Sequence, residues 1–292
     1  MKYAISNWIY GGESLEQTFQ RLQRYSYDGV ELKGEPKEYD PARVRRLCDD
    51  YDLEVLSIAG IYPWERSGRD LSNPDEERRQ QAIDYVRRCC DFAAELGAPV
   101  LIVVPSAVGK TVPVINPHDE PAWEKAVQEE WANAQSSLSA IAPHAEETGV
   151  TLAVEPINRY ETFLVNSAAQ ARELTNAIDS DAVGVHLDSF HMNIEEADPP
   201  QAVRDTADSL ANVHVADSNR EAVGRGHFDF RSFIHALLEI NYAGSIAMEP
   251  LPPVPDPYMA TQFDKFAELR DQYAQECIER LTAFEQDFQD HK

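Results

Sequence analysis

Two glutamates each end an apolar run and each precede a proline. Glu155 follows the run LAV and Glu249 follows the run IAM. Asp188 ends the run VGVHLD, and His214 lies within the run ANVHVAD. Carboxylates and imidazoles bind divalent cations and transfer protons, so these four positions are candidates for both kinds of chemistry.

Eight short β-branched or apolar runs recur along the chain, separated by segments with helical spacing. The runs cover residues 3–9, 29–34, 55–62, 100–106, 151–156, 183–188, 211–217 and 245–250. The helical segments cover residues 14–26, 42–51, 76–97, 121–149, 166–178, 199–210, 230–240 and about 259–288. Strict alternation of strands and helices predicts parallel strands joined by helical crossovers.

Eight such units in 292 residues match a (β/α)₈ TIM barrel, and we predict one domain over residues 1–292. A doubly wound open sheet is the alternative, but it rarely needs eight strands. No G-x-G-x-x-G follows the first run, and SAVGK lacks the spacing of a phosphate-binding loop. Gly97 is a predicted helix C-cap.

The four candidate residues are spaced by 33, 26 and 35 positions, each about one strand–helix unit. Active sites of such barrels form at the C-terminal ends of the strands, so the four side chains should share one pocket. Three carboxylates would repel each other there unless a divalent cation lies between them. Two Glu, one Asp and one His suit Mn²⁺ or Co²⁺, with Mg²⁺ as a further option. A single strand-end Glu or His is usually solvated or capping; four in register favour a metal site.

The charge balance limits the classes of partner. Asp and Glu number 51 against 26 Lys and Arg, for a net charge of −25, which disfavours nucleic acid as a partner. No apolar run approaches the length of a membrane span, so no membrane partner is expected. The four cysteines form no C-x-x-C pair and are predicted to be free thiols in a cytoplasmic protein. The acidic, lysine-poor composition is typical of salt-loving organisms.

Four segments closely resemble the D-tagatose 3-epimerase / D-psicose 3-epimerase family of xylose-isomerase-like TIM barrels. They are EPINRYETFLVN, HLDSFHMNIEE, HVADSNREAVGRGHFDF and AMEP. The match is dense over residues 150–250 and looser over residues 1–150.

This resemblance implies a metal-dependent ketose 3-epimerase that acts through an enediolate. Glu155, Asp188, His214 and Glu249 match the family's metal ligands, and the implied cation is Mn²⁺ or Co²⁺. Glu155 and Glu249 also match the two catalytic carboxylates, one on each face of C3, because inversion needs proton delivery from the far side. The family also implies a homodimer or homotetramer.

Further positions match substrate-binding residues of the family: Glu161, His191 and Arg220. Taken alone, Glu161 could cap a helix, His191 could be an ordinary buried histidine, and Arg220 could form a loop ion pair.

Aromatic residues at or after the first and third strands could line a sugar pocket, although core packing explains each of them equally well. They are Trp8, Tyr62 and Trp64. His186, two residues before Asp188, is expected to face the barrel interior and to pack or orient without binding metal.

Other reactions on the same barrel remain open. Hydroxypyruvate isomerase, inosose isomerase or dehydratase, and ketose-phosphate epimerase share much of the ligand set. A phosphate group needs a free cation at the barrel mouth, and only Lys110 and Arg225 are candidates. An endonuclease IV-like DNA repair enzyme needs a basic face, which this charge opposes. A non-catalytic sugar-binding barrel has no support, because both proton-transfer carboxylates are present.

Overall fold

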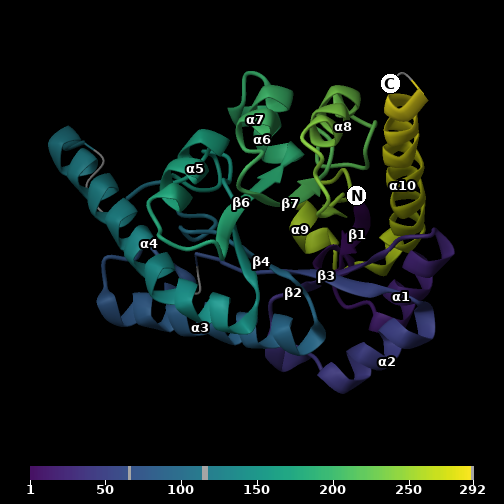
Figure 1. Ribbon diagram of the computed structural model, residues 1–292, viewed down its shortest axis with the longest axis horizontal. Helices are drawn as coiled ribbons and strands as arrows, with labels where there is room; N and C mark the ends of the chain where they lie inside the picture. Colours follow the sequence, from purple (N-terminus) through teal and green to yellow (C-terminus); the bar gives the residue numbers. More distant parts are fainter. Residues whose placement is uncertain (65–66, 114–117, 291–292) are drawn as a thin grey trace.

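The computed structural model describes residues 1–64, 67–113 and 118–290. Its eight parallel strands close into a barrel in chain order, β1 pairing with β8, which confirms the predicted (β/α)₈ fold (Figure 1). The strands are Lys2–Ser6 (β1), Gly29–Lys33 (β2), Glu54–Ala59 (β3), Val100–Val103 (β4), Thr151–Val154 (β5), Val183–Asp188 (β6), Leu210–Val215 (β7) and Ser245–Met248 (β8).

Most strands end one or more residues before the predicted boundary. Strand β5 stops at Val154 and β8 at Met248, so each candidate glutamate is the first residue past its strand. Asp188 is the last residue of β6 and pairs with His214 of β7. The prolines after the two glutamates lack an N–H for the ladder, which explains the early ends.

Helices surround the barrel: Leu15–Arg24 (α1), Pro41–Tyr51 (α2), Glu76–Leu96 (α3), Glu120–Thr148 (α4), Ala168–Asn176 (α5), Ser189–Glu195 (α6), Pro199–Asp205 (α7), Phe230–Glu239 (α8), Pro257–Ala260 (α9) and Ala267–Asp290 (α10). Short 3₁₀ turns cover Asn7–Tyr10 (η1), Pro36–Glu38 (η2), Ser67–Arg69 (η3) and Asp264–Phe266 (η4). The described helices include none that is both long and apolar enough to span a membrane.

Local sequence signals set the helix ends. The side chain of Asp75 caps the start of α3 by accepting from the backbone N–H groups of Glu77 and Arg78. Gly97 ends the same helix in the left-handed conformation, with φ of 75°, as the sequence predicted. Gly149 ends α4 in the same way.

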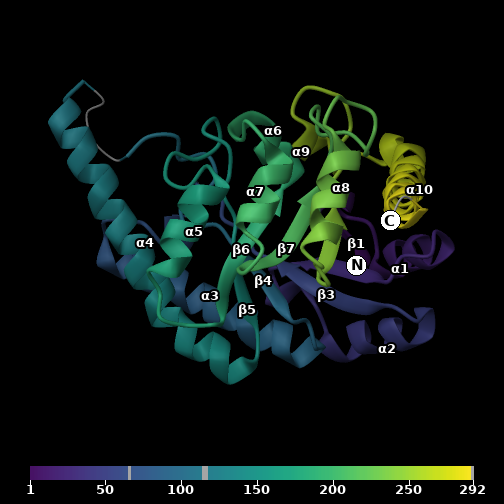
Figure 2. The ribbon, with the colours of Figure 1, turned by 45° about the horizontal axis from the view of Figure 1, so that its top comes forward.

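Helix α6 was not predicted, and the C-terminal run is three pieces, α9, η4 and α10, instead of one helix. Helix α6 has only seven residues, too few for a clear helical period in the sequence. Its N-cap is Asp188, whose carboxylate accepts from the backbone N–H of Phe190 at 2.8 Å. Figure 2 shows α6 and α9 near each other at the same end of the barrel, with α6 above β6, the strand that it follows.

The core has two parts. A large apolar cluster fills the space between the strands and the helices, and a small one consists of Ala4, Leu56 and Ala247. Ala247 and Glu249 are two residues apart, so they lie on the same face of the β8 segment. The small apolar cluster therefore lies beneath the polar mouth of the barrel.

Candidate active site

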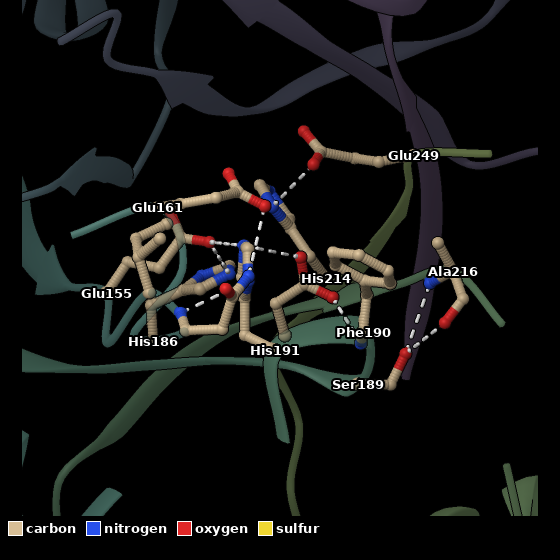
Figure 3. Close-up of polar contacts among 12 residues, drawn as sticks. Glu155, Glu161, His186, Ser189, Phe190, His191, His214, Ala216 and Glu249 are labelled. Atoms are coloured by element: carbon tan, nitrogen blue, oxygen red, sulfur yellow. Dashed lines mark hydrogen bonds and ion pairs between the residues drawn. The ribbon is translucent and has the colours of Figure 1, made fainter. Parts of the chain in front are cut away.

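The four candidate residues come together at the C-terminal ends of their strands. Figure 3 shows three of them, Glu155, His214 and Glu249, together with His186 and His191. Three overlapping groups of possible ligand atoms, each within 4.8 Å of one another, contain all of them. The groups are Glu155, His186 and His214; Glu31, His214 and Glu249; and Glu155, Asp188 and His191. His214 belongs to two of these groups and so connects the glutamates of β5 and β8.

His214 is held on both sides of its ring. Its Nε2 lies 2.9 Å from Oε2 of Glu31, and its Nδ1 lies 3.3 Å from Oε2 of Glu249. Burial alone would lower the pKa of His214, but the charges of Glu249 and Glu31 outweigh it and raise this pKa well above its ordinary value. The two carboxylates are therefore the groups that perturb this imidazole most.

Glu249 is an ionised carboxylate with three hydrogen-bonding or ionic neighbours. Arg220 donates from Nη2 at 3.0 Å, and the indole N–H of Trp8 donates to the other oxygen. Burial opposes ionisation, but His214 and Arg220 together lower the pKa of Glu249 to about 2.

Glu155 has a contrasting environment. Its nearest basic neighbours are Nε2 of His186 and Nε2 of His191, both at 3.8 Å, and the described residues donate no hydrogen bond to its carboxylate. Burial raises the pKa of Glu155 well above its ordinary value; the charge of His214 opposes this shift and the nearby carboxylates add to it. Two carboxylates at one site therefore have environments that push their pKa values apart.

Asp188 is fully buried and ion-paired. Arg220 donates to its Oδ2 from Nη1 at 2.8 Å, and Nε2 of His191 lies 3.5 Å from the same oxygen. Burial raises the pKa of Asp188, but the charges of Arg220 and His191 outweigh it and leave this pKa below its ordinary value. Arg220 adopts a positive φ of 62°, an uncommon backbone conformation that helps to direct its guanidinium between two carboxylates.

The donor set fits a divalent cation. Nδ1 of His214 and both ring nitrogens of His186 are buried without a hydrogen-bond partner in the described structure. Glu155 lacks a donor, and three carboxylates lie close together in a largely buried pocket. Oxygen ligands with one or two imidazoles are the set that Mn²⁺, Co²⁺ and Mg²⁺ accept. A cation there would satisfy the orphaned imidazole nitrogen and relieve the repulsion between carboxylates.

The three predicted substrate-binding residues also lie at this site. Glu161 accepts from Nδ2 of Asn158 at 3.0 Å, and the hydroxyl of Tyr258 lies 3.5 Å from its other oxygen. Asn158 also lies 2.8 Å from Nδ1 of His191, so it connects Glu161 with His191. Glu161 therefore faces the pocket and does not cap the helix that follows it.

A cavity of about 290 Å³ opens beside these groups. Its polar side carries Glu155, Glu161, His191, His214, Arg220 and Glu249. Its lining also includes the apolar residues Ile61, Tyr62, Ile102, Val104, Val108 and Ile157. A pocket lined by both polar and apolar groups suits a small sugar, which has both kinds of face.

Two of the three predicted aromatic residues line the cavity. Trp8 and Tyr62 belong to its wall, and Trp8 stacks on Tyr258 with ring centroids 6.0 Å apart. Trp64 does not belong to this lining: it is 38% exposed and its ring covers the ammonium of Lys110. Its neighbour Pro63, which bridges to Val108, does belong to the lining.

Neither candidate for phosphate binding is a free cation. Lys110 is buried and paired with Asp70 at 2.8 Å and with Glu130. Arg225 forms a bidentate pair with Glu276, at 2.7 and 2.8 Å. Both side chains are therefore engaged elsewhere, which favours an unphosphorylated substrate.

The Lys110 cluster yields a stability prediction. Lys110→Met removes the buried ammonium that pairs with Asp70 and Glu130, and we expect it to lower the free energy of unfolding by about 3–5 kcal/mol. Lys125→Met is the matched control, because Lys125 pairs with Glu129 while 75% exposed, and it should change the free energy by less than about 1 kcal/mol. Urea unfolding midpoints measure both; similar losses in the two variants would contradict a structural role for Lys110.

Sequence reasoning missed four residues of the site: Glu31, Ser57, Asn158 and Tyr258. Glu31 gave one signal, a carboxylate in the middle of the apolar strand GVELK. Asn158 lies inside the recognised segment EPINRYET, but its link to His191 depends on the loop conformation. Tyr258 belongs to the four-residue helix α9, which has no sequence period that could place it at the barrel mouth.

Comparison with known proteins agrees with this fold. The xylose isomerase-like TIM barrel family matches residues 19–269, and the chain belongs to this family. Family membership defines the class of protein: a barrel with its reaction centre at the C-terminal ends of the strands.

Particular relatives narrow the class. A ketose 3-epimerase of Arthrobacter globiformis is 29% identical, over 82% of this chain and 78% of that protein. A 3-dehydro-D-guloside 4-epimerase of Escherichia coli is 30% identical, over 92% of this chain and 99% of that protein. The crystal structure of a Methylomonas D-allulose 3-epimerase in complex with D-allulose matches with a TM-score of 0.82 and 25% identity, over 97% of this chain and 96% of that one.

Proposed function

We propose that this protein is a metal-dependent ketose 3-epimerase that interconverts unphosphorylated ketohexoses of the D-psicose/D-fructose or D-tagatose type. One observation carries the proposal: Glu155 and Glu249, from strands three positions apart in the barrel, line one cavity and each approach His214. Inversion at a carbon needs one group to take the proton and another to return it from the far side. Carboxylates that enter a pocket from different sides meet that need.

The reaction moves one proton at C3 of the ketose. Glu155, Asp188, His214 and Glu249 would hold a divalent cation, which would supply Lewis-acid polarisation of a substrate carbonyl. One of the two glutamates takes the C3 proton, and the other, in its protonated form, delivers a proton to the opposite face. The roles exchange when the reaction runs in reverse.

Other side chains hold the substrate in the orientation that this transfer requires. Glu161 and His191, joined through Asn158, bind the hydroxyl and carbonyl oxygens at the C1–C2 end. Arg220 lies beside that end and fixes Asp188 and Glu249. The apolar wall around Tyr62 and Val104 contacts the sugar tail and keeps water from the reacting carbon.

The proposal also covers the identity of the cation, the habitat and cell compartment of the protein, and its oligomeric state. The oxygen-rich donor set supports Mn²⁺ or Co²⁺, with Mg²⁺ as a weaker substitute. The net charge of −25 supports a high-salt habitat, and four free thiols suit the reducing cytoplasm. The family resemblance supports a homodimer or homotetramer.

Isotope incorporation tests the reaction. With Mn²⁺ in heavy water, incubation with D-fructose, D-psicose, D-tagatose or L-ribulose should give the C3 epimer with deuterium at C3, detected by NMR. Chelator-treated enzyme is the control and should incorporate none. Deuterium at C1 or C2 would contradict epimerisation and identify an aldose–ketose isomerase instead.

A second candidate is a 4-epimerase of 3-keto sugars. The E. coli 4-epimerase relative aligns over nearly its whole length, and its named reaction also inverts a carbon next to a carbonyl. The same pair of glutamates could serve either reaction. A 3-keto-glycoside substrate separates the two: deuterium at C4, with no turnover of free ketoses, would favour the 4-epimerase.

A further inference from the structure

Glu31 is a buried carboxylate at the active site to which the proposed reaction gives no task. It lies in the middle of β2, has no solvent exposure, and is paired in register with Ser57 of β3. The hydroxyl of Ser57 donates to its Oε2 at 2.6 Å, and Nε2 of His214 lies 2.9 Å from the same oxygen. Burying a carboxylate costs free energy unless it is hydrogen-bonded or ion-paired. The two contacts of Glu31 offset that cost, and they therefore point to its function.

The two ring nitrogens of His214 face different carboxylates. Nε2 is occupied by Glu31, whereas Nδ1 is buried without a hydrogen-bond partner and lies 3.3 Å from Glu249. Because a carboxylate only accepts, the hydrogen bond to Glu31 requires the proton to be on Nε2. A neutral imidazole protonated at Nε2 has its lone pair on Nδ1, on the side of the proposed cation.

We propose that Glu31 is a positioning residue that fixes the Nε2–H tautomer and the ring angle of His214, so that Nδ1 is presented to the cation. Ser57 holds the carboxylate in turn and completes a chain from strand β3 to the metal ligand. This inference rests on the proposed function, because it assigns a role toward the same cation. The described residues offer Nε2 no other acceptor, so the ring would be free to turn or exchange tautomers without Glu31.

Metal affinity tests the proposal without relying on turnover. The probe is Mn²⁺, titrated calorimetrically into chelator-treated full-length protein. Glu31→Met, nearly isosteric but without an acceptor, should weaken binding about 10- to 100-fold, the usual effect of losing such a partner. Glu31→Gln should lose much less, because its amide oxygen still accepts from Nε2. Glu54→Gln, which changes an exposed carboxylate at the start of the adjacent strand, should bind as the wild type does.

Each outcome has a distinct meaning. Wild-type-like affinity in Glu31→Met overturns the positioning role, and equal losses in the Met and Gln variants overturn it in favour of direct ligation. Wild-type protein that binds no Mn²⁺ refutes the proposed function itself. If Glu31→Met does not fold, histidine ¹⁵N NMR of Mg²⁺-saturated wild type decides: a proton on Nε2 of His214 supports the proposal, and a proton on Nδ1 overturns it.

Discussion

Glu155→Gln and Glu249→Gln should each reduce epimerase turnover by about 10²–10⁴-fold or more, because an amide can neither take nor deliver the C3 proton. Both side chains line the same cavity. Because glutamine is nearly isosteric with glutamate, the substitutions leave the size of this cavity nearly unchanged. Steady-state rates with D-fructose and D-psicose, at saturating Mn²⁺, measure the effect. Retention of full activity in either variant would remove that residue from the catalytic pair.

Isotope exchange separates the two glutamates. A variant that lacks one of them still has the other on its own face of C3. Each variant should therefore exchange the C3 proton of one epimer with heavy water while failing to form the other epimer. The two variants should differ in which epimer they exchange; identical patterns would mean that one group serves both faces.

Two controls keep this result interpretable. Calorimetric Mn²⁺ titration of each variant shows whether lost activity reflects lost metal, because both residues are also proposed ligands. Glu54→Gln makes the same chemical change at an exposed residue. Glu54 begins β3, whereas the site lies at the C-terminal ends of the strands. It should leave the rate unchanged.

Strand-end residues of the site could be predicted from sequence because barrel geometry is regular. Once eight units were recognised, the strand ends had to converge, and the structure brings Glu155, Asp188, His214 and Glu249 into overlapping groups. The predicted strands were too long. The residues that follow β3 and β4 form loops that are as apolar as strands, and apolar content alone does not distinguish a buried loop from a strand.

Residues that reach the site through loops and long-range contacts could not be predicted. Tyr258 meets Glu161 across 97 positions of the chain, and Glu31 meets His214 across 183. No local pattern encodes such pairs, because they depend on how far each strand is staggered around the barrel. Trp64 is a further example: it follows a strand as the pattern requires, but its ring contacts Lys110, 46 positions further along the chain.

Removal of bound metal is expected to abolish turnover and to lower thermal stability together. Without a cation, the carboxylates near Glu155 keep their mutual repulsion, which the neighbouring Arg220 and His214 offset in part. At a metal concentration about 100 times Kd, binding adds about 2.7 kcal/mol to the stability of the folded state. For a chain of this length that corresponds to a melting temperature higher by about 4 °C.

Dialysis against a chelator, followed by addition of one cation at a time, measures both effects in the same sample. Mn²⁺ or Co²⁺ should restore activity and melting temperature in parallel, with metal content checked by elemental analysis. Asp188→Asn removes one proposed ligand charge and should shrink the metal-dependent shift, whereas the control Lys125→Met should keep it. Full activity in metal-free protein would contradict the cation's role, because the C2 carbonyl would then be polarised by Arg220 and the histidines alone.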